Sequence, residues 1–211
     1  MSKQNYIVYD FETGGLNPKV NAVTEVAMIS IDGEKLEEID RYTTFIQPYG
    51  DLGYDQRALD ITGITMDMIN SGKDAKTVVK EMSDFIVNTG KGRGKKPILC
   101  GHKIVTFDNL FAEVLFKTHR KDFYSLINNE VYIDTMWWSR MRSPIDEDEH
   151  GKHALSAACN RAGIELTDGH RAMNDTASNS LLVVEYLKSL RGAGGATEIV
   201  PKHIFRDHFK F

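Results

Sequence analysis

The sequence predicts an α/β fold in which a mixed five-stranded sheet is flanked by helices. Strand-like segments fill the first part of the chain, and strands alternate with helix-like segments after it. This order is typical of a single mixed sheet that is covered by helices. A length of 211 residues with 41% apolar residues allows one domain with a substantial core.

The first three strands are expected to form an antiparallel meander. An apolar run at 6–9 suits a strand buried on both faces, and a second strand follows at 23–31 after a turn rich in Gly. Asp32-Gly33 is typical of a hairpin turn, so the chain should return as a third strand at 42–46.

Helices and strands alternate in the rest of the chain. Apolar residues recur at helical spacing at 78–86 and again at 107–115. A loop rich in Gly and Lys at 90–96 precedes a short strand at 97–100, and the last strand is expected at 131–133. The remaining segments are a helix that ends at residue 142, a polar loop at 143–152, and helices at 153–162 and 173–190.

A change in composition marks the end of the domain. Glycines become frequent after Arg191 and predict a flexible link. We therefore expect one domain over 1–191 and a Gly-linked tail over 192–211. Three Phe in this tail favour docking, either on its own domain or on a partner.

The formal net charge of −4 gives no general attraction to polyanions. Binding of nucleic acid would therefore depend on a local basic patch, or on metal ions that neutralise carboxylates. Two clusters could supply such a patch, although a solvated loop is the more ordinary explanation for each. These clusters are Lys91, Arg93, Lys95 and Lys96, and His119, Arg120 and Lys121.

The location of the chain is expected to be the cytoplasm. Only two cysteines occur, far apart, which suits a reducing compartment better than a disulfide framework. The first residues lack the apolar region of a signal peptide, and no apolar run is long enough to span a membrane. No membrane partner is expected.

Two acids at the end of the first strand are the first candidate site residues. Asp10 and Glu12 flank Phe11, and because side chains alternate along a strand, both carboxylates point to one face. Adjacent carboxylates beside a buried sheet repel each other unless a cation lies between them. Mg²⁺ and Mn²⁺ prefer oxygen ligands of this kind. The bare pattern is not specific, since Asp32-Gly33-Glu34 repeats it in a hairpin turn.

Two further acids follow later elements. Asp108 comes after the fourth strand in the first turn of a helix, where the helix dipole also favours an ordinary acid. Asp175 lies at the start of the last long helix, five residues after His170. If that helix begins near residue 172, His170 lies on the preceding loop and can fold back over Asp175, as a general base would.

Asp134 is a further acid at a strand-to-helix junction. Because it directly precedes Thr135 and a predicted helix, we interpret it as a helix cap rather than as a fifth ligand. Trp137 and Trp138 could stack on bases, but at least one of them is expected in the core.

The order and spacing of these motifs resemble the DEDDh (DnaQ-like) family of 3′–5′ exonucleases, in the RNase H-like superfamily. This family includes proofreading epsilon subunits, ribonuclease T, oligoribonuclease and the TREX enzymes. The resemblance covers about residues 5–190 and rests on five motifs in one order, each weak by itself. The matching stretches are Ile7 to Gly15, Ala58 to Thr65, Gly101 to Asp108, Ile133 to Thr135, and His170 to Asp175.

The resemblance implies a two-metal site. Carried over by position, Asp10, Glu12, Asp108 and Asp175 bind two Mg²⁺, for which Mn²⁺ should substitute, and His170 is the general base that takes a proton from the attacking water. Two ions about 3.5–4 Å apart can stabilise both the attacking and the leaving oxygen of a phosphodiester. The implied reaction releases nucleoside 5′-monophosphates from a 3′ end.

The resemblance also implies residues that contact the substrate. Thr13, Gly14 and Leu16 match a segment that lies along the terminal nucleotide, where Gly14 would let the backbone approach the sugar and Leu16 could pack on the last base. His102 matches a position near the substrate, although a polar residue that caps a loop explains it equally well. Lys103 stands where the family often has Asn, and it could contact a phosphate.

A second departure from the family concerns residues 61–63, where related sequences often have His and this chain has Ile-Thr-Gly. Because neither departure falls on the five core positions, both bear on the nucleotide contacts rather than on the chemistry.

Several substrates and roles stay open at this stage. Single-stranded DNA is favoured because the motif spacing is most similar to that of proofreading subunits, with proofreading or DNA repair as the implied role. A 3′–5′ exoribonuclease similar to ribonuclease T or oligoribonuclease is the alternative, since no motif reveals how the 2′-OH is treated. An inactive nucleic-acid-binding or scaffold module is disfavoured because all five core residues are present. A polymerase or another replication protein is a candidate partner, and the oligomeric state is not determined.

Overall fold

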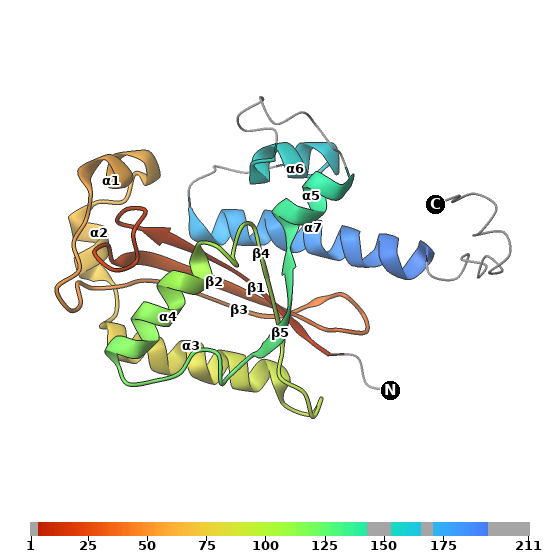
Figure 1. Ribbon diagram of the computed structural model, residues 1–211, viewed down its shortest axis with the longest axis horizontal. Coiled ribbons are helices and arrows are strands. Elements are labelled where there is room, and N and C mark those ends of the chain that lie inside the picture. Colours follow the sequence, from red (N-terminus) through yellow and green to blue (C-terminus); the bar gives the residue numbers. More distant parts are fainter. Residues whose placement is uncertain (1–3, 143–152, 166–170, 194–211) are drawn as a thin grey trace, which may run out of the picture.

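The computed structural model describes residues 4–142, 153–165 and 171–193. The expected α/β fold is confirmed, because a five-stranded mixed sheet is covered by helices (Figure 1). The strands are β1 (Tyr6–Thr13), β2 (Val23–Ile31), β3 (Glu38–Phe45), β4 (Ile98–Gly101) and β5 (Asn128–Asp134). The helices are α1 (Gln56–Thr62), α2 (Met66–Ser71), α3 (Ala75–Gly90), α4 (Asp108–Thr118), α5 (Thr135–Arg142), α6 (Leu155–Arg161) and α7 (Ala172–Ala193).

The central strand of the sheet is β1. The strand order is β3-β2-β1-β4-β5, so β1 pairs antiparallel with β2 and parallel with β4. The antiparallel meander of β1, β2 and β3 is confirmed, with Asp10 opposite Ala27 and Glu12 opposite Glu25. The pairing of β1 with β4 reaches only from Tyr6 to Val8.

Alternation along β1 divides its side chains between two layers. Ile7, Tyr9 and Phe11 are buried in the core beneath α3 and α4. Tyr6 and Val8 lie on the opposite face, in a cluster with apolar residues of α7. The helices accordingly lie on both sides of the sheet, with α3 and α4 on one side and α5, α6 and α7 on the other (Figure 1).

Two strands differ in their bounds from the expected ones, since β3 spans Glu38–Phe45 rather than 42–46 and β5 spans Asn128–Asp134 rather than 131–133. The first strand runs from its apolar segment through the two acids expected at its end and stops at Thr13, because its ladder with β2 continues to that residue. The helices α1 and α2 were not predicted. Each of them is short, and buries only one residue (Leu59 and Ile69, respectively), so neither has enough apolar positions to show a helical period. Side chains of the preceding Asp and Thr cap them instead.

The expected loop at 143–152 lies outside the described residues. The tail over 192–211 also lies outside them, apart from its first two residues. Within the described part of the chain, no helix is both long and apolar enough to cross a membrane.

Gly101, the last residue of β4, is expected to tolerate no side chain. A Cβ at this position would lie 1.8 Å from Cγ2 of buried Ile104 and 3.0 Å from the carbonyl oxygen of Tyr9. We expect Gly101→Ala to lower the free energy of unfolding by about 1–3 kcal/mol, because the neighbours must move. Urea denaturation measures this difference.

The matched control is Gly53→Ala. A Cβ at Gly53 would meet only the carbonyl oxygen of Val20, at 3.9 Å, so its effect on stability should be small. Equal midpoints for the two variants would show that the end of β4 accommodates a Cβ at Gly101.

Candidate active site

Three carboxylates from two elements meet at the end of β1. Asp10 and Glu12 are two positions apart on β1, on the face of the sheet that α7 covers. Asp175 lies in the first turn of α7. Ligand oxygens of these three residues all lie within 4.8 Å of one another. A strand and a helix that are far apart in the sequence therefore form one acidic cluster.

Asp108 lies beside this cluster as the first residue of α4. Its side chain is buried, and its Oδ1 accepts a hydrogen bond from the backbone N–H of Phe11 at 3.1 Å. This N–H lies beyond the end of the pairing between β1 and β4, which stops at Val8. Asp108 thus satisfies a buried donor of β1 and is held against the strand that carries the other acids.

Burial and mutual repulsion disfavour ionisation of these acids. Burial, followed by the charges of Asp108 and Glu12, raises the pKa of Asp10 well above its usual range. Burial, and then the charges of Asp175 and Glu25, raises the pKa of Glu12 to about 8. The pKa of Asp108 is also raised, chiefly by burial. Without a cation, the cluster favours protonated carboxyl groups.

The donor set fits a hard divalent cation. Every member is a carboxylate oxygen, which Mg²⁺ and Mn²⁺ accept and which soft metals do not prefer. A cation placed between Asp10, Glu12 and Asp175 would offset the repulsion that raises the pKa values of Asp10 and Glu12. These three acids, together with Asp108 beside them, are the residues that could hold metal.

The turn after β1 holds the first three residues expected to bind substrate. The hydroxyl of Thr13 donates to the carbonyl oxygen of Gly15 at 2.7 Å, and Leu16 is 85% exposed. A Cβ on Gly14 would lie 2.6 Å from the ring of Tyr54. The absence of a side chain at Gly14 therefore has a packing reason within the chain, besides any approach of a substrate.

His102 and Lys103 lie in the segment between β4 and α4. Both ring nitrogens of His102 are engaged, with Oγ1 of Thr135 at 3.0 Å and with the carbonyl oxygen of His153 at 2.8 Å. Burial lowers the pKa of His102, which favours the neutral ring. In this arrangement His102 links the end of β4 to α5, as the loop-capping explanation predicts. Lys103 adopts a positive φ of 67° and extends toward the ring of Phe107.

Asp134 acts as the cap that its position predicted. Its Oδ1 accepts the backbone N–H of Met136 at 3.1 Å, in the first turn of α5, and that of Lys103 at 2.9 Å. Of the two tryptophans, Trp138 stacks on Tyr186, whereas Trp137 is exposed. The expectation that at least one tryptophan packs inside is confirmed.

His170, the expected general base, lies outside the described residues. The next residue, Arg171, was not predicted to have a role. Its guanidinium forms an ion pair with Glu25 of β2 at 3.1 Å. Glu25 was also missed, although an acid within the otherwise uncharged strand Val23–Ile31 is an unusual feature that could have drawn notice.

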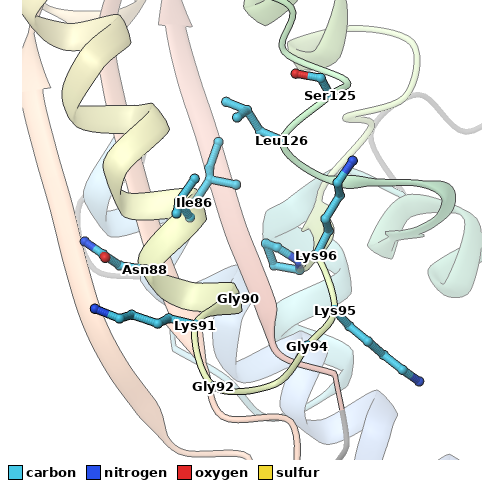
Figure 2. Close-up of a pocket in the computed structure, with 12 residues that line it drawn as sticks. Ile86, Asn88, Gly90, Lys91, Gly92, Gly94, Lys95, Lys96, Ser125 and Leu126 are labelled. Carbon is cyan, nitrogen blue, oxygen red and sulfur yellow. The ribbon is translucent and has the colours of Figure 1, made fainter.

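A pocket of about 560 Å³ lies away from the carboxylates, between the end of α3 and the loop that precedes β4 (Figure 2). Lys91 and Lys95 of the first basic cluster point to different sides of this loop. Arg93 of the same cluster is paired with Asp32. Because these cations do not converge on one point, the cluster fits a solvated loop better than a built anion site.

Comparison with known proteins identifies relatives of the whole described fold. The family model for exonucleases named RNase_T matches residues 7–182. The DNA polymerase III PolC-type protein of Bacillus cereus is 31% identical over 190 residues, and that of Bacillus subtilis is 29% identical over 194 residues. These stretches are 90% and 92% of this chain but only 12% of each relative.

Solved structures of Escherichia coli exonuclease I share the fold. The complex with a dT13 oligonucleotide matches with a TM-score of 0.70 and 19% identity, over 86% of this chain and 40% of that chain. The complex with a dA16 oligonucleotide matches with a TM-score of 0.72 and 18% identity, over 88% and 41%. Because the family model covers most of the sequence and these structures share its five-stranded sheet, the chain belongs to the exonuclease family and has an RNase H-like exonuclease fold.

Proposed function

We propose that this chain is a 3′–5′ exonuclease domain that uses two Mg²⁺ ions to release nucleoside 5′-monophosphates from single-stranded DNA. The observation that carries the proposal is the meeting of Asp10, Glu12 and Asp175 within 4.8 Å, with buried Asp108 beside them. Such a cluster is costly unless cations occupy it, and a phosphodiester needs cations to accept a nucleophile.

Each residue has a distinct part in this proposal. Asp10, Glu12 and Asp175 hold the metal ions, and Asp108 completes the set from the start of α4. Two bound ions would lower the pKa of the attacking water and stabilise the charge that develops on the phosphate. His170, one residue before Arg171 and five before Asp175, accepts the proton of that water.

The residues proposed to contact the substrate lie in the turn after β1 and in the segment between β4 and α4. Leu16 is exposed at the end of β1, where it can pack against the terminal base, and Thr13 and Gly14 line the approach of the sugar. Lys103 supplies a positive charge next to the carboxylates and contacts a phosphate. The engaged ring of His102 gives it an indirect part, through the segment that carries Lys103 and Asp108.

DNA is the proposed substrate because of the relatives. The similar proteins from Bacillus are named as DNA polymerases, and the similar structures include exonuclease I bound to DNA oligonucleotides. We propose that the domain spans 1–191 and removes mismatched nucleotides beside a polymerase or during repair. The tail over 192–211 would then dock on the domain or on that partner.

We expect loss of any cluster carboxylate to abolish 3′ degradation. Asp10→Asn and Asp175→Asn should each lower the rate by at least about two orders of magnitude, since one lost electrostatic contact to a transition state already costs about 10²-fold. The measurement uses 5′-labelled and 3′-labelled single strands, as DNA and as RNA, with Mg²⁺, Mn²⁺ or EDTA. Release of mononucleotides from the 3′ end defines the polarity, and the faster strand defines the substrate.

The matched control for these variants is Asp84→Asn, which removes an exposed acid of α3 whose pair with Lys80 is worth little. It should degrade DNA at the rate of the unchanged chain.

In the absence of metal, Asp10→Asn and Asp175→Asn should be at least as stable as the unchanged chain, because each removes a carboxylate that its neighbours repel. A folded chain that shortens no strand with either metal would refute the proposed activity.

Metal binding is expected to release protons near neutral pH. Because the pKa of Glu12 is raised to about 8 in the metal-free chain, a cation must displace its proton at pH 7. Affinity for Mn²⁺ should therefore rise as the pH increases from 7 toward about 8. Calorimetric titration in buffers of different ionisation enthalpy counts the protons, and Glu12→Gln should release fewer of them. The same proton count for both chains would contradict the assignment of Glu12 as a ligand.

A further inference from the structure

Glu25 is a further carboxylate beside the cluster, and its side chain is buried. It lies on β2 directly opposite Glu12 in the sheet and is 3% exposed. Its charge is one of the causes that raise the pKa of Glu12. An additional acid here increases the repulsion at the site, so its presence requires a compensating interaction.

Both oxygens of Glu25 are used by one short segment of the chain. Oε1 accepts Nη2 of Arg171 at 3.1 Å, and Oε2 accepts Nε of Arg171 at 3.2 Å. Oε2 also accepts the backbone N–H of Ala172 at 3.3 Å. A carboxylate with this set of donors is neutralised by its partner. Glu25 is therefore not a free ligand that could join Asp10 and Glu12 on a metal.

These contacts fix the beginning of α7. Ala172 is the first residue of the helix, and a negative charge at this end satisfies an open N–H and interacts favourably with the helix dipole. The carbonyl oxygen of Arg171 in turn accepts the N–H of Asp175 at 3.1 Å. Asp175 is thus connected to β2 through the first turn of α7 and through the ion pair between Arg171 and Glu25.

A second contact, with an aromatic ring, also holds Arg171. Its guanidinium lies 5.3 Å from the centre of the Phe45 ring, at the end of β3. Arg171 is therefore placed by two neighbouring strands of the sheet. Its side chain is still 42% exposed, whereas that of Glu25 is 5% exposed.

We infer that the Glu25–Arg171 pair is a positioning device that sets Asp175 against Asp10 and Glu12. The pair anchors the start of α7 to β2, next to the strand that carries the other two acids. Without it, the first turn of α7 can shift, and the ligand oxygen of Asp175 leaves the 4.8 Å cluster. This inference rests on the proposed function for its catalytic consequence, but its effect on metal binding can be measured separately.

The test compares Glu25→Gln, Arg171→Ala, Arg171→Lys and the double variant Glu25→Gln/Arg171→Ala. Partners that orient a metal ligand typically change metal affinity or activity by about 10–100-fold. We expect Glu25→Gln and Arg171→Ala each to raise the Kd for Mn²⁺ by about 10-fold or more, measured by calorimetry without substrate. On single-stranded DNA, kcat should fall by a similar factor, while KM changes by less than about 3-fold.

The double variant tests whether the two residues act as a unit. Because each single change already breaks the pair, the double variant should be little worse than Arg171→Ala alone. Arg171→Lys keeps the positive charge but cannot form the bidentate hydrogen bonds. It should therefore bind Mn²⁺ more tightly than Arg171→Ala and less tightly than the unchanged chain. Losses that simply add would overturn the inference.

The chain offers a matched control pair. Arg41 and Glu38 form the same two-pronged contact, with two distances of 2.7 Å, on the exposed edge strand β3. Glu38→Gln and Arg41→Ala should leave Mn²⁺ affinity and kcat unchanged, since an exposed pair contributes little.

Other outcomes have definite meanings. Variants at Glu25 and Arg171 that melt earlier but bind Mn²⁺ with unchanged affinity would overturn the inference and leave a purely stabilising pair. A higher KM in Arg171→Ala, with no effect of Glu25→Gln, would make Arg171 a direct phosphate contact and also overturn it. If the unchanged chain binds Mn²⁺ yet shortens no strand, the proposed function fails while the Mn²⁺ titrations still decide the inference. An unchanged chain that binds no Mn²⁺ would refute both.

Discussion

Repulsion among the carboxylates at the end of β1 is the constraint that the surrounding structure must satisfy. Asp10, Glu12 and Asp175 bring their oxygens within 4.8 Å, and buried Asp108 lies beside them. Burial and mutual repulsion raise the pKa values of Asp10 and Glu12, so the metal-free chain favours neutral carboxyl groups. Divalent cations reverse that preference. The arrangement is thus unfavourable for the isolated chain and suited to the metals that the proposed reaction requires.

The fold meets this constraint by using one strand for two purposes. Ile7, Tyr9 and Phe11 of β1 are buried in the apolar core under α3 and α4. The alternate residues face α7, and the last two of them are the acids of the site. Because the same backbone carries core and site, packing of the core places Asp10 and Glu12 with little freedom. Asp108 is fixed to this backbone by the hydrogen bond from Phe11.

The ion pair between Glu25 and Arg171 extends the same logic to the last helix. Asp175 is distant in sequence from β1, so some contact has to hold the start of α7 near the sheet. Glu25 provides it through three hydrogen bonds to Arg171 and Ala172. The charge of Glu25 is balanced by the guanidinium, which separates this acid from the four that are proposed to bind metal. A buried acid can therefore support a metal site without being a ligand.

The sequence by itself determined the α/β class, the meander of β1 to β3, the place of Asp108 in the first turn of a helix and the exonuclease family. Alternation and helical periodicity are local properties, and the order of the motifs is read directly along the chain. It missed α1 and α2, whose short lengths show no period, and it began β3 at residue 42 although the ladder with β2 starts at Glu38. Only the tertiary structure decided that Asp108 bonds to β1 and that Glu25 bonds to Arg171. These contacts join residues about a hundred or more positions apart, and their geometry follows from strand register and helix packing, which local patterns do not specify.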